Sequence, residues 1–119
     1  MIRGSCHCGA VRFKLDATPE WLTRCNCSYC RRAGAIWAHD EVQRIALSYD
    51  PEGVVRYVWG DETLAFVSCR ACGCTTHWES LDPETSPRMA VNCAMAEPQD
   101  IAGLRVRHFD GAETWRFVD

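Results

Sequence analysis

Apolar and polar residues alternate in many short segments of this chain, and no segment repeats with a long helical period. Alternation with a period of two is typical of half-buried β-strands. We therefore expect strands at residues 10–15, 21–25, 36–39, 45–49, 54–59, 64–67, 75–79, 88–94, 105–109 and 114–118. Residues 31–35 are expected to form a loop or one helical turn, and residues 97–103 a helical turn. The pattern predicts a mainly β fold.

Turn residues separate these segments at three informative places. The proline and glycine of Asp50–Gly53 favour a turn between two predicted strands. Asp110 and Gly111 lie between the last two predicted strands and favour a hairpin. Cys69 and Cys72 lie between another pair of strands, which predicts a metal-binding knuckle at a hairpin tip. We find no repeats or linkers, so residues 1–119 are predicted to form a single domain.

Composition and charge narrow the classes of function. The chain has 119 residues, of which 47% are hydrophobic and 24% charged, as is ordinary for one folded domain. Its net charge of -3 provides no basic surface of the kind that binds nucleic acid. It contains neither an apolar run long enough to span a membrane nor the apolar core of a signal peptide. We expect a cytoplasmic protein with no nucleic-acid or membrane partner.

The cysteine content needs an explanation of its own. Nine cysteines are an odd number, and no export signal suggests an oxidising compartment. Closely spaced cysteines in a reducing compartment bind metal more often than they bind each other. We therefore predict zinc sites rather than a disulfide framework.

Two cysteine pairs far apart in the chain suit a closed metal site. Cys6 and Cys8 lie near the start, and Cys69 and Cys72 lie more than sixty residues later. Four thiolates complete a tetrahedral structural zinc site. Such a site adds stability that a small core lacks. The alternative is a zinc ribbon that has this site alone, with the remaining cysteines incidental.

Three further cysteines occur within six residues, in Cys25-Asn26-Cys27-Ser28-Tyr29-Cys30. One loop can wrap three thiolates around a cation, whereas a structural zinc takes four protein ligands. A catalytic zinc has three protein ligands and one position for water or substrate. The fourth ligand here is left open between Cys74, Cys93, a histidine, water and an external thiol. An external thiol bound there would be deprotonated.

Two arginines follow the triplet directly. Arg31 and Arg32 have the geometry to hold a ligand carboxylate beside the metal. The simpler alternative is that they offset the negative charge of three thiolates. Trp37 and Trp59 are candidates for the wall of a ligand pocket.

The other polar candidates have ordinary structural explanations. Cys74 follows the knuckle and is expected to be a buried small residue, with a role as a spare ligand as the alternative. Cys93 is expected to be a packed free thiol in a strand. The four histidines are expected to be surface or satisfied core residues, although any of them could shuttle protons: His7, His39, His77 and His108.

Three motifs together resemble one known family. These are Gly4-Ser5-Cys6-His7-Cys8-Gly9-Ala10-Val11-Arg12-Phe13, then Cys25-Asn26-Cys27-Ser28-Tyr29-Cys30-Arg31, then Cys69-Arg70-Ala71-Cys72-Gly73. In order and spacing the chain resembles the glutathione-dependent formaldehyde-activating enzymes, also called the GFA or centromere-protein-V-like family. Asn26 stands where that family often has histidine, and Cys74 where a small hydroxyl residue is common.

The resemblance implies a Mss4-like β-tent fold with two zinc ions. By position, Cys6, Cys8, Cys69 and Cys72 match the structural ligands, and Cys25, Cys27 and Cys30 match the catalytic-type site. The implied activity is that of a carbon–sulfur lyase, which joins a thiol such as glutathione and the aldehyde formaldehyde into an S-hydroxymethyl adduct. The alternatives are a non-catalytic thiol binder and a Mss4-like protein-interaction module. Exposed strand edges are compatible with a homodimer.

Overall fold

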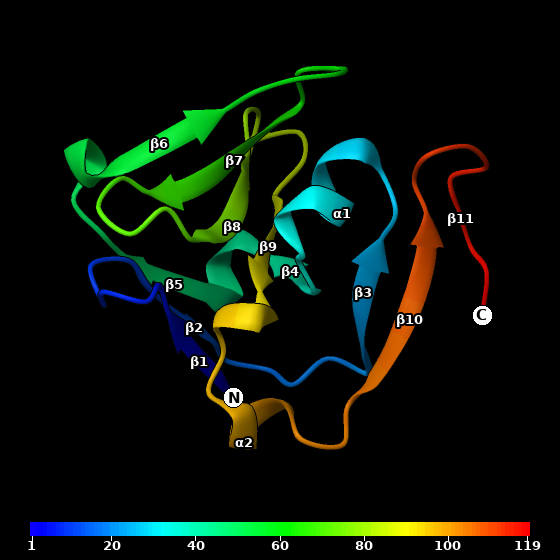
Figure 1. The fold of residues 1–119 in the computed structure, drawn as a ribbon, viewed down its shortest axis with the longest axis horizontal. Coiled ribbons are helices and arrows are strands. Elements are labelled where there is room, and N and C mark those ends of the chain that lie inside the picture. The colour runs from blue at the N-terminus through cyan, green and yellow to red at the C-terminus, as the bar shows by residue number, and fades with distance from the viewer.

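A computed structural model describes all residues from 1 to 119. It contains a three-stranded and an eight-stranded sheet, which lie beside each other in Figure 1. The small sheet has the order β1-β2-β5, and its strands are β1 (Ile2–Ser5), β2 (Arg12–Leu15) and β5 (Ile45–Ser48). The large sheet has the order β11-β10-β3-β4-β9-β8-β7-β6. The mainly β fold that the sequence predicts is confirmed.

The strands of the large sheet come from almost the whole chain. They are β3 (Trp21–Cys25), β4 (Trp37–Glu41), β6 (Val54–Tyr57), β7 (Leu64–Cys69), β8 (Thr75–Ser80), β9 (Arg88–Asn92), β10 (Arg105–Asp110) and β11 (Arg116–Phe117). All neighbouring strands run antiparallel except β10 and β3, which are parallel. This one parallel pair brings a late segment of the chain beside Cys25.

Helical structure is short and lies in the connections. The α-helices are α1 (Ser28–Ala33) and α2 (Pro98–Ile101). The 3-10 helices are Val42–Arg44, Pro51–Gly53 and Cys93–Met95. None of these helices has both the length and the apolar character that crossing a bilayer requires.

Several predicted boundaries were wrong. The strand β1 was not predicted, since Ile2 is its only buried residue. The strand predicted to reach Trp59 ends at Tyr57, and the one predicted to reach Ala94 ends at Asn92. There the Asn92 side chain accepts a hydrogen bond from the Ala94 backbone N–H and starts a 3-10 turn. The last strand is only two residues long, because residues 111–115 form a wider loop.

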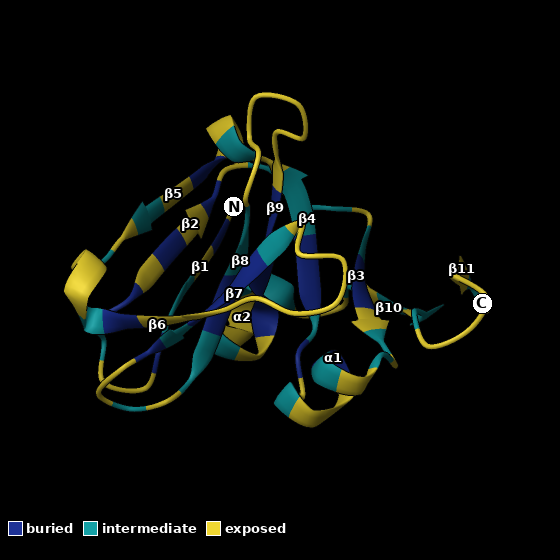
Figure 2. Cartoon of the chain, turned by 90° about the horizontal axis from the view of Figure 1, so that it is seen from above, coloured by how far each residue is buried: buried dark blue, intermediate teal, exposed yellow.

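The buried side chains form three clusters, and Figure 2 shows that the central strands carry most of the buried positions. One cluster lies between the two sheets and includes Ile2, Phe13, Leu22 and Val91. A second contains Cys6 and Cys69 packed with apolar residues. The third contains Cys30, Trp37 and Phe66, with Cys25 and Cys27 packed against it. Each cysteine motif therefore has a core cluster of its own.

Candidate metal centre and ligand pocket

The four distant cysteines meet at one point. Cys6 and Cys8 follow β1, and Cys69 ends β7 beside the turn that contains Cys72. Their four sulfur atoms lie within 4.8 Å of one another. The Sγ atoms of Cys6 and Cys8 are 3.7 Å apart, and those of Cys8 and Cys69 are 3.6 Å apart. A tetrahedron with zinc–sulfur bonds of about 2.3 Å has edges of about 3.8 Å, so the geometry fits zinc.

Backbone N–H groups support this cluster. The Val11 N–H donates to Cys6 Sγ at 3.3 Å. The Cys74 N–H donates to Cys72 and, as the largest cause, lowers the pKa of that thiol to about 5. Donors aimed at sulfur favour the thiolate, which is the form that binds metal. Because this cluster has four ligands, it matches a closed structural site.

The triplet is brought together by one strand end and one short helix. Cys25 ends β3, Cys27 is the N-cap of α1, and Cys30 lies inside that helix. The Cys30 N–H donates to Cys27 Sγ at 3.3 Å, as an N-cap side chain usually accepts from the first turn. Gly34 ends α1 in the left-handed conformation, with φ of 66°, which glycine adopts without strain. The three sulfur atoms lie within 4.8 Å of one another.

The triplet also has polar support. The Trp37 indole N–H donates to Cys30 Sγ at 3.3 Å, and the Cys27 N–H donates to Cys25 Sγ at 3.4 Å. A hydrogen bond from the Cys30 thiol is the largest cause that lowers the pKa of Cys25 to about 6. The same bond and burial raise the pKa of Cys30. The donor set is that of a zinc site with three thiolates.

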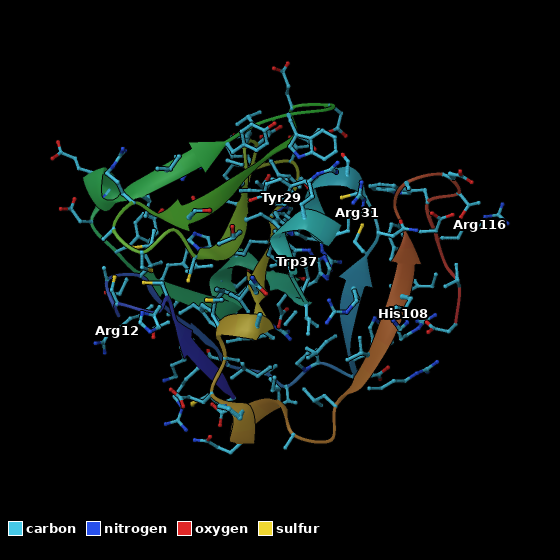
Figure 3. The ribbon with its side chains drawn as sticks, in the orientation of Figure 1. Arg12, Tyr29, Arg31, Trp37, His108 and Arg116 are labelled. Carbon is cyan, nitrogen blue, oxygen red and sulfur yellow. The ribbon has the colours of Figure 1, made fainter.

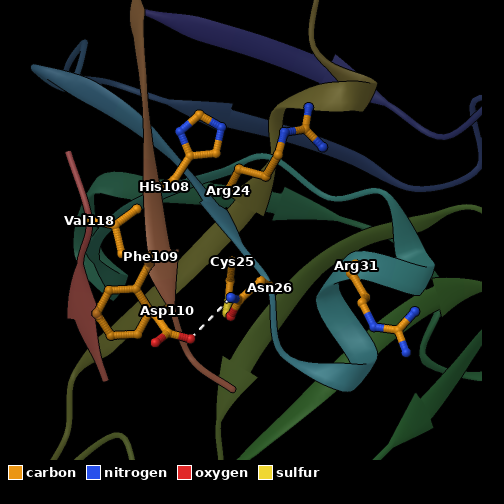
Figure 4. Close-up of a pocket in the computed structure, with 8 residues that line it drawn as sticks. All are labelled: Arg24, Cys25, Asn26, Arg31, His108, Phe109, Asp110 and Val118. Carbon is orange, nitrogen blue, oxygen red and sulfur yellow. Dashed lines mark hydrogen bonds between the residues drawn. The ribbon is translucent and has the colours of Figure 1, made fainter. Parts of the chain in front are cut away.

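A shallow pocket of about 370 Å³ opens beside Cys25. Its lining includes Arg31 on α1, Arg24 on β3 and His108 on β10, which are labelled in Figure 4. Arg24 and His108 are register partners in the parallel β3–β10 pair. His108 Nδ1 lies 2.7 Å from an Asp119 carboxylate oxygen, whereas neither Arg24 nor Arg31 has an acidic partner within ion-pair distance. Two unpaired guanidinium groups therefore lie at a pocket beside one sulfur of the triplet.

The structure separates the two arginines that follow the triplet. Arg31 lines the pocket, whereas the guanidinium of Arg32 donates to the Ser28 carbonyl at 2.7 Å. Figure 3 shows Arg31 and Trp37 beside α1. Trp37 is buried and contacts Cys30, so it does not wall the pocket. Trp59 lies in the exposed β6–β7 loop and does not line it.

The remaining candidates lie outside both clusters. Cys74 packs near the four-cysteine cluster without belonging to it. Cys93 is buried, and burial raises the pKa of its thiol to about 12. His77 is fully buried between Thr76 and Glu79, with hydrogen bonds of 2.8 and 2.7 Å. Burial lowers the pKa of His39 to about 4.

Sequence reasoning did not place four residues beside the triplet: Arg24, His108, Asp110 and Gly111. Asp110 and Gly111 signalled a turn, and they do form one, but the turn lies against Cys25. The signal that was missing is the parallel pairing of β3 with β10, which no local pattern encodes. Arg24 was adjacent to Cys25 in the sequence and could have been a candidate on that ground.

The family model described as "Glutathione-dependent formaldehyde-activating enzyme" matches residues 1–109. The chain belongs to this family. The resemblance carried by the three cysteine motifs is confirmed. The match covers both cysteine clusters and ends at Phe109, just before the loop that contacts Cys25.

Two relatives of this member of the formaldehyde-activating family are informative. A Halomonas elongata protein named "Putative glutathione-dependent formaldehyde-activating enzyme" is 52% identical over 33 residues, which are 27% of this chain and 21% of that protein. The match thus spans about a fifth of that relative's length. The crystal structure of a Rhodobacter sphaeroides protein superimposes with a TM-score of 0.69 at 30% identity, covering 87% of this chain and 98% of that one.

Proposed function

We propose that this protein binds a small anionic thiol such as glutathione at a zinc ion held by Cys25, Cys27 and Cys30. There it forms, or cleaves, the S-hydroxymethyl adduct of that thiol with formaldehyde, which is a carbon–sulfur lyase reaction. Cys6, Cys8, Cys69 and Cys72 hold a second, structural zinc. The family to which the chain belongs supports the choice of thiol and aldehyde.

One observation carries the proposal. The triplet offers three sulfur ligands, with no fourth cysteine, histidine or carboxylate in its cluster, and Cys25 borders a pocket with two unpaired arginines. A zinc site with three protein ligands is the catalytic type. Such a zinc supplies a position where an external thiol binds as its thiolate.

The chain's own residues orient the ligand. Three thiolates and one zinc ion together carry one net negative charge, which would repel an anionic thiol. Arg31 and Arg24 offset this charge and bind the carboxylates of the ligand. In the reaction the thiol loses its proton to solvent and its sulfur attacks the carbonyl carbon. A carbon–sulfur bond forms as the carbonyl π bond breaks, and the carbonyl oxygen takes up a proton from solvent. The products of the reverse direction are the free thiol and the aldehyde.

The compartment in which the protein acts can be inferred from the same chemistry. A thiolate-bound metal and a thiol ligand both require reducing conditions, so we propose that the protein acts in the cytoplasm. The whole chain is proposed to act as one domain, because its two cysteine clusters pack against connected sheets.

The first test is the zinc content of protein purified under reducing conditions, measured with and without glutathione. We expect about two zinc ions per chain for the wild type and about one for Cys27→Ser. Formation of the adduct from glutathione and formaldehyde, followed by NMR, should be faster than the uncatalysed background with the wild type only.

The other results separate the alternatives. Two zinc ions and saturable glutathione binding without faster adduct formation would leave a thiol carrier and overturn the enzyme. Loss of folding in Cys27→Ser, with no glutathione affinity in the wild type, would favour an interaction module. One zinc under all conditions would overturn the proposed function.

A further inference from the structure

The side chains of Asn26 and Asp110 join two loops where the parallel strands β3 and β10 end. Within the strands, Cys25 is the register partner of Phe109. Just beyond, the Asn26 N–H donates to the Phe109 carbonyl at 3.1 Å. The Asn26 side-chain amide donates to Asp110 Oδ1 at 3.0 Å, the bond drawn in Figure 4. Its oxygen accepts from the Ala112 N–H at 3.0 Å.

Asp110 holds its own loop in one conformation. Its carboxylate accepts hydrogen bonds from Asn26, from the N–H groups of Glu113 and Thr114 and from the Thr114 hydroxyl. The bond from Asn26 is the largest cause that lowers the pKa of Asp110 to about 2. The Asp110 carbonyl accepts from the Trp115 N–H at 2.7 Å. Trp115 has φ of 59° and is 72% exposed, so the loop keeps an unfavourable backbone conformation.

This loop places Gly111 directly on the triplet. A Cβ atom on Gly111 would lie 2.6 Å from Cys25 Sγ and 3.4 Å from the Cβ of Cys27. Real side chains do not make contacts as short as the first, so a Cβ at residue 111 would force the Cys25 sulfur to move. The Gly111 backbone is also a minor cause of the lowered pKa of Cys25. The peptide of residue 111 therefore covers one side of a sulfur that the proposed function assigns to zinc.

We propose that Asn26 and Asp110 are positioning residues, which act through the Gly111 peptide to fix Cys25 in its ligand geometry. We name Asn26, Asp110 and Gly111 the clamp. Its role toward zinc rests on the proposed function, but its action on Cys25 exists without metal. Loss of the clamp frees the Cys25 sulfur and weakens the second zinc site. It leaves the four-cysteine site unchanged, because no clamp residue contacts that site.

The tests exchange the amide and the carboxylate within the clamp. Asn26→Asp places two carboxylates face to face and should break the clamp. The double variant Asn26→Asp with Asp110→Asn restores an amide–carboxylate bond in the opposite direction. Gly111→Ala tests the close approach, and Gly53→Ala is its control, because a Cβ there meets nothing nearer than 3.6 Å.

The first readout is competition between the protein and a chelator for the second zinc. Residues that orient metal ligands change metal affinity by roughly 10- to 100-fold, and we expect a loss in this range for Asn26→Asp and Gly111→Ala. The double variant should recover most of it, and Gly53→Ala should match the wild type. In cobalt-loaded protein, the thiolate-to-cobalt absorption of the second site, taken as the difference from Cys27→Ser, should shift with Asn26→Asp and return in the double variant.

The second readout needs no metal at the triplet and separates this proposal from the proposed function. It uses Cys27→Ser protein, which is expected to keep the structural zinc and the fold. There the Ala112 amide, which donates to the Asn26 side chain, should exchange slowly with solvent. Adding Asn26→Asp should speed this exchange by at least about 10-fold, and adding both clamp substitutions should slow it again. If the wild type binds one zinc only and this exchange pattern holds, the zinc function fails and the clamp stands. Fast Ala112 exchange in folded Cys27→Ser protein, or a second zinc affinity unchanged by Asn26→Asp, would overturn the clamp.

Discussion

The two cysteine clusters offer the same ligand atom, a cysteine sulfur, but they have different structural roles. The four-cysteine cluster joins the start of the chain to the β7–β8 turn, and two of its cysteines are part of a buried apolar cluster. The three-cysteine cluster comes from six consecutive residues, lies at a short helix and borders a pocket. The first cluster connects distant segments, whereas the second relies on other elements to hold it in place.

The difference lies in what each cluster does for the fold. A metal that links distant segments closes a long loop, so its binding energy is folding energy. A metal held by neighbouring residues closes only a small loop and adds little to global stability. The sulfurs of the triplet are instead oriented by Trp37 and the clamp. A local cluster can therefore exchange ligands without unfolding the protein.

The largest effect is expected when one ligand is removed from each cluster, which tests whether the two clusters contribute differently to stability. Cys69→Ser should lose the structural zinc and more than about 5 kcal/mol of stability, or fail to fold. Cys27→Ser should lose the other zinc at a cost below about 2 kcal/mol, since only the N-cap bond and a local loop are affected. Guanidinium denaturation followed by circular dichroism measures both. Equal losses would show that the two clusters share one role.

A second experiment concerns the polar network on the four-cysteine side. Glu79 accepts hydrogen bonds from Tyr49, Arg56 and His77, and Tyr49 packs against the cluster of Cys6 and Cys69. The bond from His77 is the largest cause that lowers the pKa of Glu79 to about 2. Because the folded pKa is depressed, its contribution is complete above the unfolded pKa of about 4.5 and is lost as pH falls toward 2.

Glu79→Gln should therefore cost about 2 kcal/mol at pH 7, and its difference from the wild type should shrink as the pH falls below about 4.5. Using the difference cancels any loss of metal that both proteins share. The exposed Glu84→Gln is the control, and the measurement is urea denaturation at a series of pH values. Glutathione binding by Glu79→Gln at pH 7 should match the wild type; a large loss would mean that the two sides are coupled.

Substitutions of the neighbouring Arg31 and Arg32 test how the three-cysteine side of the molecule binds an anionic thiol. Arg31→Gln should weaken glutathione binding by roughly 5- to 10-fold, the effect of one partly exposed charge-assisted contact. Arg32→Gln should have no such effect, because its guanidinium is occupied by the Ser28 carbonyl. Calorimetric titration with glutathione and with the neutral thiol 2-mercaptoethanol separates charge recognition from thiol binding. An equal loss for both thiols would contradict the proposed role of Arg31.

The smallest effect is expected at Cys74. Its sulfur belongs to neither cluster, so Cys74→Ser should retain both zinc ions and wild-type glutathione affinity. Zinc analysis of the purified variant measures this. Loss of one zinc would show that the four-cysteine site, against which Cys74 packs, depends on this residue.

The sequence predicted local features well. The cysteine spacings indicated both clusters, and the alternating segments indicated most strands, because these signals depend on residues close in the chain. Arg31 and Arg32 could not be told apart, since their roles depend on the direction in which a six-residue helix presents each side chain.

The surroundings of the triplet could not be predicted in the same way. Arg24, His108, Asp110 and Gly111 meet there because β10 pairs in parallel with β3, more than eighty residues away in the chain. Asn26 differs from the histidine that is common in the family, and its partner Asp110 lies just past the family match. Long-range pairing of this kind follows from how the whole sheet assembles, not from any one segment.

The parallel β3–β10 pair also sets an order in which the protein matures during synthesis. The four-cysteine site has all its ligands once residue 72 has been translated. The three-cysteine site has its ligands by residue 30, but Asp110 and Gly111 are translated well after Cys72. Because synthesis proceeds from the N-terminus, the loop that contacts Cys25 is made after the ligands of both clusters. A nascent chain can thus acquire its structural metal well before its ligand-binding centre is complete.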